Sequence, residues 1–454
     1  MPRANLILLT VECWRGDHFG PLTPNLVRLG EESAVFSAAY SSGGWTQPAM
    51  TAMMSSAYAS MFGGFTVGLA TPERQLLAEC LLPSGYSTAG FTANLICGTM
   101  NGFHRGFGTF EDARRKPRLP DGLAPEQMNW RRLVEMGIPP RDLGTFCDAA
   151  HMTDLGLRWI GNRQRDEPFF LWLHYMDPHW PCLTPDPPAD HQQLHDAWYD
   201  RYLFRTEVIP NKGRYDPGEE ARIRWTNRYR DALTSADREI GRLLAALRSR
   251  ADWDRTVVAV AGDHGEEFYE HGCWHHGWNQ LYREGIHVPL IVRAPGASPQ
   301  RATHPVSQLD IAPTLLDYAG ASQERTKRPM MGTSLRPAIE GREFQHRPVY
   351  TEMLGHFNGS SYKLAILDGE WKYIYDLEDP HHSKLFRVAD DPAERDDLRE
   401  RQQEVFLRFE KMRFAHVSLG LTRLLSDSAP QERQVEMDDL VKEQMIALGY
   451  LAAD

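Results

Sequence analysis

The sequence predicts an α/β fold in which helices cover both faces of a large, mostly parallel β-sheet. Short apolar runs alternate with helical patterns along most of the chain, and this alternation is typical of a parallel sheet. The 454 residues are 42% hydrophobic, which supplies a sizeable core and excludes disorder of the whole chain. At about 100–200 residues per domain, the length fits two to four domains or one large α/β domain with an appendage.

Four short apolar runs are the predicted core strands. Asn5–Val11 is the first of them, and residues 169–173, 256–261 and 288–292 are the others. Each run is bounded by polar residues and is too short for a typical helix, so we interpret each as a buried strand.

Two helices are indicated by their starts and their periodicity. Thr23 and Pro24 are typical of an N-cap followed by a first helical turn. After Pro217 and Gly218, apolar residues recur at helical spacing, which predicts a long amphipathic helix. The residues on its apolar face are Leu233, Ala236, Ile240, Leu243, Leu244 and Leu247.

The character of the chain changes at about residue 344. Short runs rich in Val, Ile and Tyr alternate there with Gly and Asp turns, which predicts a small antiparallel sheet followed by a helical tail. We therefore expect one α/β domain over residues 1–343 and a C-terminal sheet with a helical tail over 344–454, packed on it. The predicted strands are 348–350, 363–366 and 371–375.

Two stretches, residues 112–146 and 181–218, are rich in Pro, Arg, Asp and Trp and have weak periodicity. Long irregular segments of α/β proteins often shape a substrate entrance. The alternative is that both are plain surface excursions.

Charge and composition restrict the partners. The formal net charge of −11 argues against non-specific nucleic-acid binding, and no apolar run approaches the about 20 residues of a membrane helix. The N-terminal apolar stretch runs into Glu12 and Arg15 without a small-residue cleavage site, so we interpret it as a strand and not a signal peptide. The six cysteines lack paired spacing, so disulfides are not implied. We expect a cytoplasmic protein without nucleic-acid or membrane partners, and a homo-oligomer remains open.

Polar side chains follow the predicted strands, where ligands gather in open α/β sheets. Glu12 follows the first strand, His174 and His179 follow 169–173, and Asp263–His264 follows 256–261. Singly, a Glu or His at such a position is more often structural, but a charged pair directly after an apolar strand requires a partner. Together they suit a divalent cation, and the imidazoles shift the choice from calcium toward zinc, manganese or iron.

Thr46 precedes Pro48 and a run that continues as a helix. Its hydroxyl would lie at a helix N-terminus, where backbone N–H groups and the helix dipole favour an anion. The alternative is that Thr46 is only an N-cap. A threonine is a competent nucleophile only when a base or a metal lowers the pKa of its hydroxyl, and the nearby carboxylates and histidines would supply that metal.

Over nearly the whole chain, the order and spacing of these motifs resemble the sulfatase branch of the alkaline phosphatase superfamily. The opening strand with Glu12 is similar to the strand that carries the family's metal carboxylates. Residues 45–48, Trp-Thr-Gln-Pro, stand at the nucleophile motif. Residues 262–268, Gly-Asp-His-Gly-Glu-Glu-Phe, together with His276 are highly characteristic of the family.

Departures from the sulfatase pattern bear on function. Sulfatases carry Cys or Ser in a C/S-x-P-x-R motif and convert it to formylglycine, whereas this chain has Thr46, Pro48 and Met50. Threonine cannot become formylglycine. The usual paired aspartates are Glu12–Cys13 here, and the usual Asp-Asn is Asp263–His264.

The altered set resembles the threonine-dependent members, namely phosphoethanolamine and glycerol-phosphate transferases, nucleotide phosphodiesterases and phosphonate monoester hydrolases. Those transferases are membrane-anchored and this sequence shows no anchor, so water is the expected acceptor. The resemblance implies a metal-dependent hydrolase of small anionic phosphate esters, either phosphodiesters or phosphonate monoesters. Thr46 would attack phosphorus and form a phosphothreonine intermediate that water then hydrolyses.

The resemblance also assigns roles to individual residues. One or two Mn²⁺ or Zn²⁺ ions are expected, and Ca²⁺ is less expected. The implied metal ligands are Glu12, Thr46, Asp263 and His264. His179 and His276 would act beside Thr46 as catalytic residues that stabilise charge or protonate the leaving alkoxide. Asn94 and His174 are the implied substrate contacts, although Asn94 is equally compatible with a turn.

Two other functions stay open. The chain could be a sulfatase that uses an unmodified threonine. It could also be a binding protein that keeps the sulfatase fold without the chemistry, which the departures at Cys13 and Met50 favour and the complete ligand set argues against.

Overall fold

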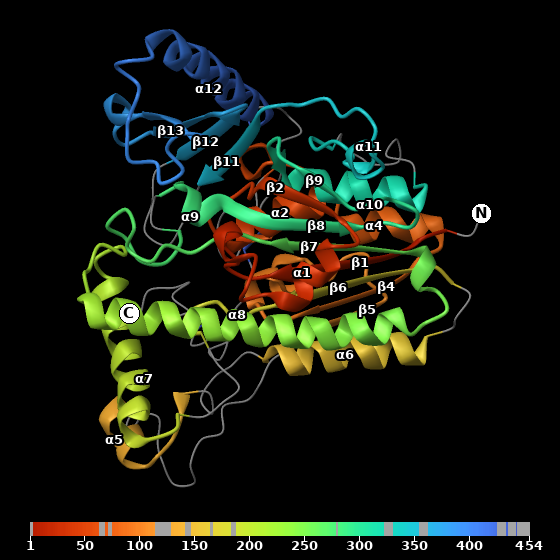
Figure 1. The fold of residues 1–454 in the computed structure, drawn as a ribbon, viewed down its shortest axis with the longest axis horizontal. Helices are drawn as coiled ribbons and strands as arrows, with labels where there is room; N and C mark the ends of the chain where they lie inside the picture. Colours follow the sequence, from red (N-terminus) through yellow and green to blue (C-terminus); the bar gives the residue numbers. More distant parts are fainter. Residues whose placement is uncertain are drawn as a thin grey trace.

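The computed structural model describes residues 3–424 apart from 63–68, 71–74, 114–128, 141–146, 164–166, 183–187, 278–279, 322–329 and 354–361, and beyond them only 433–434 and 442. The centre of this structure is a mixed, mostly parallel nine-stranded sheet in the order β10-β2-β8-β7-β1-β6-β4-β5, with β9 paired to β2 (Figure 1). The predicted α/β class is confirmed.

The large sheet contains the four strands that the sequence predicts. The strands of this sheet are β1 (Asn5–Val11), β2 (Ala34–Tyr40), β4 (Ser87–Thr92), β5 (Thr109–Asp112), β6 (Phe169–Tyr175), β7 (Thr256–Gly262), β8 (His287–Arg293), β9 (Gln300–Ala302) and β10 (Val306–Ser307). β1 runs parallel to both β6 and β7 at the centre, whereas β8 runs antiparallel to β7 and β2. The carboxyl ends of β6, β1 and β7 therefore meet at one edge.

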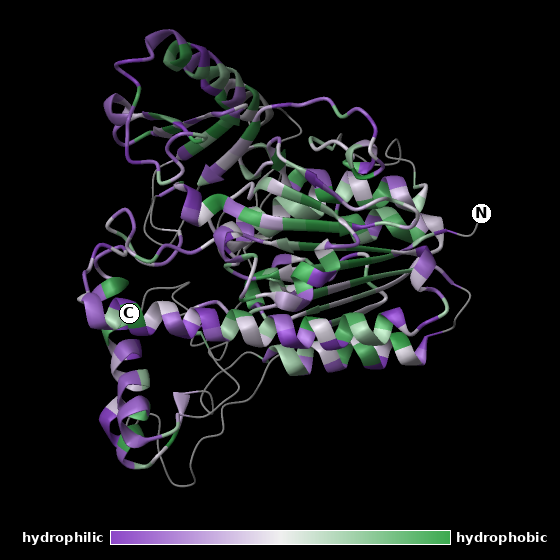
Figure 2. Ribbon diagram, in the orientation of Figure 1, coloured by the Kyte–Doolittle hydropathy of each residue, from purple (hydrophilic) through white to green (hydrophobic). Residues whose placement is uncertain are grey.

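Side chains of the central strands alternate between two apolar cores, one on each face of the sheet. In β1, Ile7, Leu9 and Val11 belong to one core, and Leu6 and Leu8 belong to the other. This is the period of two that a strand buried on both faces requires. Figure 2 shows the apolar residues gathered between the sheet and its helices.

Helices cover each face (Figure 1). The face with Ile7 is packed by α1 (Pro24–Gly30), α6 (Ala149–Asn162) and α8 (Glu219–Arg248). The opposite face is packed by α2 (Thr46–Ser55), α4 (Leu77–Leu81) and α10 (Ile311–Ala319). Shorter elements are α3 (Ala59–Phe62), α9 (Arg283–Ile286), α11 (Arg336–Ile339), and the pair β3 (Leu69–Ala70) and β15 (Arg433–Gln434).

Both helices expected from the sequence are present. All six apolar residues predicted for one face of α8 are buried. α1 begins at Pro24 as expected, but the side chain of Thr23 does not cap it. Instead, Asp237 of α8 accepts hydrogen bonds from the backbone nitrogens of Asn25 and Leu26, each at 3.0 Å.

The predicted C-terminal antiparallel sheet is confirmed. It consists of β11 (Val349–Met353), β12 (Lys363–Asp368), β13 (Trp371–Asp376) and β14 (Lys384–Arg387), followed by α12 (Gln403–Leu424). One face of this sheet packs with α12 around Leu364, Tyr373 and Phe409, and the other face joins the core of the large sheet. The division between residues 343 and 344 stays a prediction.

The two irregular stretches are partly described. α5 (Trp130–Glu135) and α7 (His191–Leu203) pack on each other through Leu133 and Trp198, and together they project from the sheet in Figure 1. Their role as a substrate entrance stays a prediction. Among the described residues, no helix is both long enough and apolar enough to span a membrane.

Candidate active site

The candidate site lies at the carboxyl ends of β6, β1 and β7. Glu12 directly follows β1, His174 is the penultimate residue of β6, and Asp263–His264 directly follows β7. Because β1 pairs in parallel with both neighbours, these ends are level, and all four side chains are fully buried. The sheet therefore brings together the carboxylates and imidazoles that the sequence predicted.

Thr46 reaches this site as the first residue of α2. The N-cap position belongs to Trp45, so the interpretation of Thr46 as an N-cap alone is wrong. The Thr46 hydroxyl donates a hydrogen bond to Glu12 Oε1 at 2.5 Å and lies 3.2 Å from His264 Nε2. The Thr46 hydroxyl is thus buried at a helix N-terminus, where the helix dipole favours an anion, and it contacts a carboxylate.

The turn before Thr46 is closely packed. A Cβ atom on Gly43 would lie 2.6 Å from the backbone nitrogen of Ala49, so only glycine fits there. β11 of the C-terminal sheet meets this turn, since the backbone nitrogen of Glu352 donates to the Ser42 carbonyl at 3.1 Å. The C-terminal sheet thus helps to fix the segment that carries Thr46.

Glu12 is the most connected side chain of the site. Its Oε2 accepts hydrogen bonds from His174 Nε2 at 2.5 Å and from Asn94 Nδ2 at 3.1 Å. Asn94 Oδ1 also accepts from the backbone nitrogen of Ile96 at 2.9 Å. The two predicted substrate contacts, His174 and Asn94, therefore both touch Glu12, and His174 stands among the potential metal donors.

Asp263 is held by its backbone neighbours and leaves one oxygen free. Its Oδ1 accepts hydrogen bonds from the backbone nitrogens of Cys13 at 2.9 Å and His264 at 2.7 Å. Its Oδ2 is buried without a hydrogen-bond partner and lies 3.4 Å from His264 Nε2. A buried carboxylate oxygen without a donor is placed as a metal ligand would be.

The ionisable groups of the site shift one another's pKa values. Burial and the neighbouring charge of Glu12 raise the pKa of Asp263 to about 7. Burial acts in the same direction on Glu12, but hydrogen bonds with His174 and His264 outweigh it and hold the pKa of Glu12 well below its ordinary value. Burial lowers the pKa of His264, yet Asp263 and Glu12 together raise that pKa to about 9. Burial thus sets the carboxylates of Glu12 and Asp263 against the positive charge of His264.

The donor set fits a divalent transition metal. Ligand atoms of Glu12, His174 and Asp263 lie within 4.8 Å of one another, as do those of Glu12, Cys13 and His264. Carboxylate oxygens mixed with imidazole nitrogens suit Zn²⁺ or Mn²⁺ better than Ca²⁺, which prefers oxygen ligands alone. A cation here would also relieve the repulsion between Glu12 and Asp263.

His276 and His179 lie beside this set. The ring centroid of His276 is 4.2 Å from that of His264 and 5.1 Å from that of His179. His276 Nδ1 faces Glu266 Oε2 at 3.3 Å, which leaves the buried Nε2 without a partner. Burial lowers the pKa of His179 to about 4, and burial with His275 and His264 lowers that of His276, so both imidazoles are neutral.

Three neighbours received no role from the sequence. Glu266 lies within 3.4 Å of both His275 and His276, and Cys13 Sγ lies 3.5 Å from His276 Nδ1. Glu266 stands two positions after His264 in the Gly-Asp-His-Gly-Glu-Glu-Phe motif of residues 262–268. This spacing is the one sequence signal that could have indicated Glu266 as part of the site. The structure places His276, the histidine that the resemblance named, beside His264, whereas His275 lies against Glu266.

Comparison with protein families agrees with this arrangement. Residues 4–321 match the sulfatase family, and residues 269–413 match the C-terminal family of N-sulphoglucosamine sulphohydrolase. The chain belongs to the sulfatase family. This family is part of the alkaline phosphatase superfamily, as the sequence resemblance indicated.

Relatives of this sulfatase-family chain differ in how much of the chain they match. Choline-sulfatase of Rhizobium meliloti is 31% identical over 263 residues, which cover 55% of this chain and 48% of that protein. The chain therefore spans about half the length of that relative. The multifunctional alkaline phosphatase superfamily protein PehA of Trinickia caryophylli is 25% identical over 492 residues, 87% of this chain and 92% of PehA.

Solved structures share the fold. The phosphonate monoester hydrolase of Agrobacterium radiobacter superimposes with a TM-score of 0.69 at 19% identity, covering 95% of this chain and all of that chain. A 2-O GAG sulfatase superimposes with a TM-score of 0.70 at 18% identity, covering 97% and 96%. At these identities the likeness establishes the alkaline phosphatase-like fold alone.

Proposed function

We propose that this sulfatase-family protein is a metal-dependent hydrolase of phosphate esters, acting on phosphodiesters or phosphonate monoesters with Thr46 as the nucleophile. The observation that carries the proposal is the 2.5 Å hydrogen bond from Thr46 Oγ1 to Glu12 at the N-terminus of α2. Phosphonate monoester hydrolases among the structural neighbours are consistent with it.

The proposed metal ligands are Glu12, Asp263 and His264 with the hydroxyl of Thr46, and His174 would orient Glu12 through the hydrogen bond that it donates. When bound, a Mn²⁺ or Zn²⁺ ion supplies positive charge that lowers the pKa of the threonine hydroxyl and stabilises the transferred group. The Oδ2 of Asp263, which is buried without a hydrogen-bond partner, is the observation that supports this fit.

In the first step, Thr46 Oγ1 would attack phosphorus in line and the bond from phosphorus to the leaving alkoxide would break. The N-terminus of α2 favours the negative charge that gathers on the phosphoryl oxygens. Thr46 would release its proton to Glu12, which accepts its hydrogen bond, and His179 or His276, which burial keeps neutral, would relay this proton to the leaving alkoxide.

In the second step, water would attack the phosphothreonine and restore the threonine. The same imidazole, neutral again, would accept the proton of this water, since His276 Nε2 has no other partner in the site. The phosphorus–Oγ1 bond then breaks, Oγ1 regains a proton from this imidazole through Glu12, and a phosphate monoester or a phosphonate leaves.

A sulfate ester is the second candidate substrate, because the family match and choline-sulfatase both favour it. Parallel assays with aryl sulfate, aryl phosphate, bis-aryl phosphate and an aryl phosphonate monoester separate the two candidates by relative kcat/KM. We expect the phosphodiester or phosphonate monoester to be the best substrate. A clear preference for aryl sulfate would overturn the phosphate assignment.

Thr46→Ala tests the nucleophile. We expect loss of nearly all turnover, by several orders of magnitude, because no other hydroxyl replaces the attacking oxygen. Thr51→Ala is a matched control, since it removes a hydroxyl from the same helix that only donates to the Gln47 carbonyl. A catalytically silent binding protein would show no turnover with any ester after reconstitution with Mn²⁺ or Zn²⁺.

A further inference from the structure

The two histidines beside the candidate metal ligands have different groups behind their rings. His179 Nδ1 lies 2.6 Å from the backbone carbonyl of Trp180, whereas His276 Nδ1 lies 3.3 Å from the carboxylate of Glu266. The proposed function leaves the proton relay to either imidazole and gives Glu266 no part in it. The group behind each ring therefore decides which histidine is suited to carry a proton.

A short hairpin sets Glu266 opposite His276. Two antiparallel pairs of its residues fix the register. They are Phe268 with Trp274, which form a bridge, and Glu267 with His275, whose backbone nitrogen donates to the Glu267 carbonyl at 3.0 Å. The next pair in this register is Glu266 with His276, and opposed side chains of an antiparallel pair lie close together on one face. The backbone therefore places the carboxylate against the imidazole.

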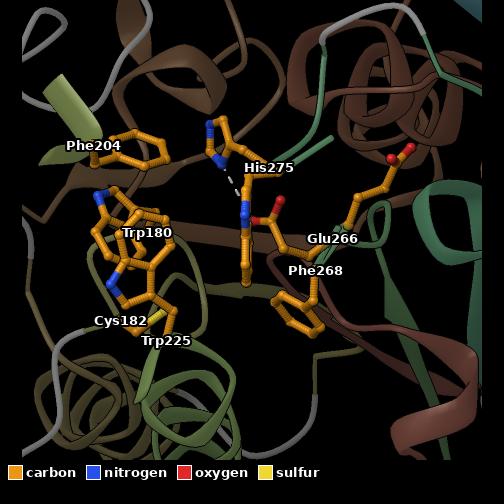
Figure 3. A pocket seen from close by; sticks show the side chains of 9 residues that line it. Trp180, Cys182, Phe204, Trp225, Glu266, Phe268 and His275 are labelled. Carbon is orange, nitrogen blue, oxygen red and sulfur yellow. Dashed lines mark ion pairs between the residues drawn. The ribbon is translucent and has the colours of Figure 1, made fainter. Parts of the chain in front are cut away.

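Glu266 is largely shielded from solvent. Its exposed fraction is 5%, and the space beside it and His275 is about 20 Å³, room for about one water molecule. Aromatic rings form much of the wall, since Trp180 contacts Trp225 with ring centroids 4.9 Å apart and Trp225 contacts Trp274 at 5.0 Å (Figure 3). The ion pair between Glu266 and His275, 3.4 Å across, is drawn there as a dashed line. A hydrogen bond to a carboxylate is stronger in such a dry environment than in water.

The carboxylate of Glu266 fixes the proton of the neutral His276 ring at Nδ1. A carboxylate only accepts hydrogen bonds, so the nitrogen that faces it at 3.3 Å is the donor. Cys13 Sγ also lies 3.5 Å from this nitrogen, but a thiol is a weak hydrogen-bond partner beside a carboxylate. With the proton at Nδ1, Nε2 carries a lone pair, and this nitrogen is buried without a hydrogen-bond partner. His276 is therefore set to accept a proton at Nε2.

A proton on Nε2 turns the ring into an imidazolium, whose stability depends on the group behind it. Behind His276 that group is the carboxylate of Glu266, which stabilises the cation by its charge as well as by its hydrogen bond. Behind His179 it is the Trp180 carbonyl, which carries no net charge. His276 is therefore the better proton relay of the two.

We propose that Glu266 is a positioning residue that makes His276, and not His179, the proton relay of ester hydrolysis. This inference rests on the proposed function. Nε2 of His276 would take the proton that Thr46 releases through Glu12 and give it to the leaving oxygen as the bond from phosphorus to that oxygen breaks. Nδ1 keeps its own proton against Glu266 throughout, so the ring is neutral again after the step.

Leaving groups of different strength test this role. The full-length, Zn²⁺-loaded protein is assayed with phenyl and 4-nitrophenyl esters of methylphosphonate, or of methyl phosphate if diesters are preferred. A nitrophenolate leaves easily and requires little protonation. We expect Glu266→Gln to lower kcat/KM about 100-fold for the phenyl ester and about tenfold or less for the 4-nitrophenyl ester. An equal loss for both esters would overturn the proposal, since a purely structural role lowers both alike.

Double variants identify the histidine. Glu266→Gln should lower kcat/KM hardly further in a His276→Gln background, because Glu266 acts through that ring, whereas its full effect should persist in His179→Gln. The reverse pattern would overturn the assignment of His276. The single histidine variants decide the question even if Glu266→Gln does not fold: His276→Gln should impair the phenyl ester selectively, and His179→Gln should impair both esters alike.

Glu267→Gln is the matched control. Burial above all raises the pKa of Glu267 well above its ordinary value, so the amide replaces a neutral carboxyl of the same shape. Its kcat/KM for both esters and its bound Zn²⁺ should match those of the wild type. Glu266→Gln should also hold as much Zn²⁺ as the wild type by elemental analysis, and loss of an ion would overturn the proposal by making Glu266 a metal ligand.

Histidine-selective nitrogen NMR of the Zn²⁺-loaded protein tests Glu266 without turnover. We expect the His276 signals, assigned by their loss in His276→Gln, to show a proton on Nδ1 and a bare Nε2. Absence of hydrolysis of every phosphorus ester would refute the proposed function. Hydrolysis with the His276 proton on Nε2, or with equal losses for both leaving groups in Glu266→Gln, would refute only the role of Glu266.

Discussion

Asp263→Asn is expected to stabilise the metal-free protein while it abolishes metal binding and turnover. The amide oxygen of the variant would keep the acceptor that Cys13 and His264 use, because Oδ1 of Asp263 receives both backbone hydrogen bonds. The amide nitrogen would replace the unpartnered Oδ2 and face His264 Nε2, at the 3.4 Å that now separates the two groups. The substitution therefore preserves shape and removes one buried charge.

The magnitude follows from the raised pKa of Asp263. Its folded-state pKa of about 7 lies above the ordinary value of 3.8, so the carboxyl's contribution to stability is full below 3.8 and is lost as pH rises through 7. At about 1.4 kcal/mol for each pKa unit, the ionised carboxylate lowers the free energy of unfolding by about 4 kcal/mol at pH 8. In the wild type, the raised pKa of His264, about 9 and caused partly by Asp263, adds about 1 kcal/mol to the free energy of unfolding at pH 8, and the variant would lose this contribution. The net gain for Asp263→Asn is about 3 kcal/mol.

Differential scanning calorimetry in excess chelator measures this gain. An unfolding entropy of about 2 cal/mol/K per residue gives roughly 1 kcal/mol/K for this chain, so Tm should rise by about 3 °C at pH 8. At pH 4 the carboxyl is protonated in the folded wild type, and the two proteins should unfold at nearly the same temperature. Saturating Mn²⁺ or Zn²⁺ should stabilise only the wild type, by about 2.7 kcal/mol at a hundredfold excess over Kd. A metal-free variant that is less stable than the wild type at pH 8 would refute the reasoning.

Three further predictions concern stability. Lys372→Met should lower the free energy of unfolding in urea by about 3–5 kcal/mol, because Lys372 Nζ lies 2.7 and 2.8 Å from the two buried oxygens of Glu394. Adding Glu394→Leu to that variant should restore most of the lost stability, because no buried charge is then left unpaired. Glu352→Gln should flatten the loss of stability as pH falls below about 4.5: burial raises the pKa of Glu352, but its contacts with His416 and Ser60 lower it overall. An equally steep acid limb in that variant would contradict this. Asp237→Ala should cost about 1 kcal/mol through the lost cap of α1, and an unchanged midpoint would contradict the capping role.

Local patterns sufficed to predict the elements that the site depends on. β1, β6 and β7 and the face of α8 are all apparent as apolar periodicity, which depends only on neighbouring residues. The reversed direction of β8 was not predictable in this way, because strand direction depends on the connections between strands. The cap of α1 was missed for a similar reason: Asp237 lies far along the chain from Asn25.

The residues of the candidate site were predictable from the sequence, but their contacts with one another were not. Strand ends explain why Glu12, His174 and Asp263 converge, since parallel neighbours end at one edge. The sequence did not indicate that His174 and Asn94 both contact Glu12, because these contacts depend on rotamers and on the path of the turn after β4. The packing of Trp180 on Phe204 and Trp225 (Figure 3) was equally hidden, because the three rings come from separate elements.

Acid-quench mass spectrometry of the Mn²⁺-loaded protein tests the central claim most directly. The protein is mixed with its best aryl phosphodiester or phosphonate monoester, quenched in acid during turnover, digested and mapped. We predict a phosphoryl or phosphonyl group on Thr46 that is absent from Thr46→Ala and present in the Thr51→Ala control. Modification of another residue, or full turnover by Thr46→Ala, would contradict the assignment of Thr46 as the nucleophile.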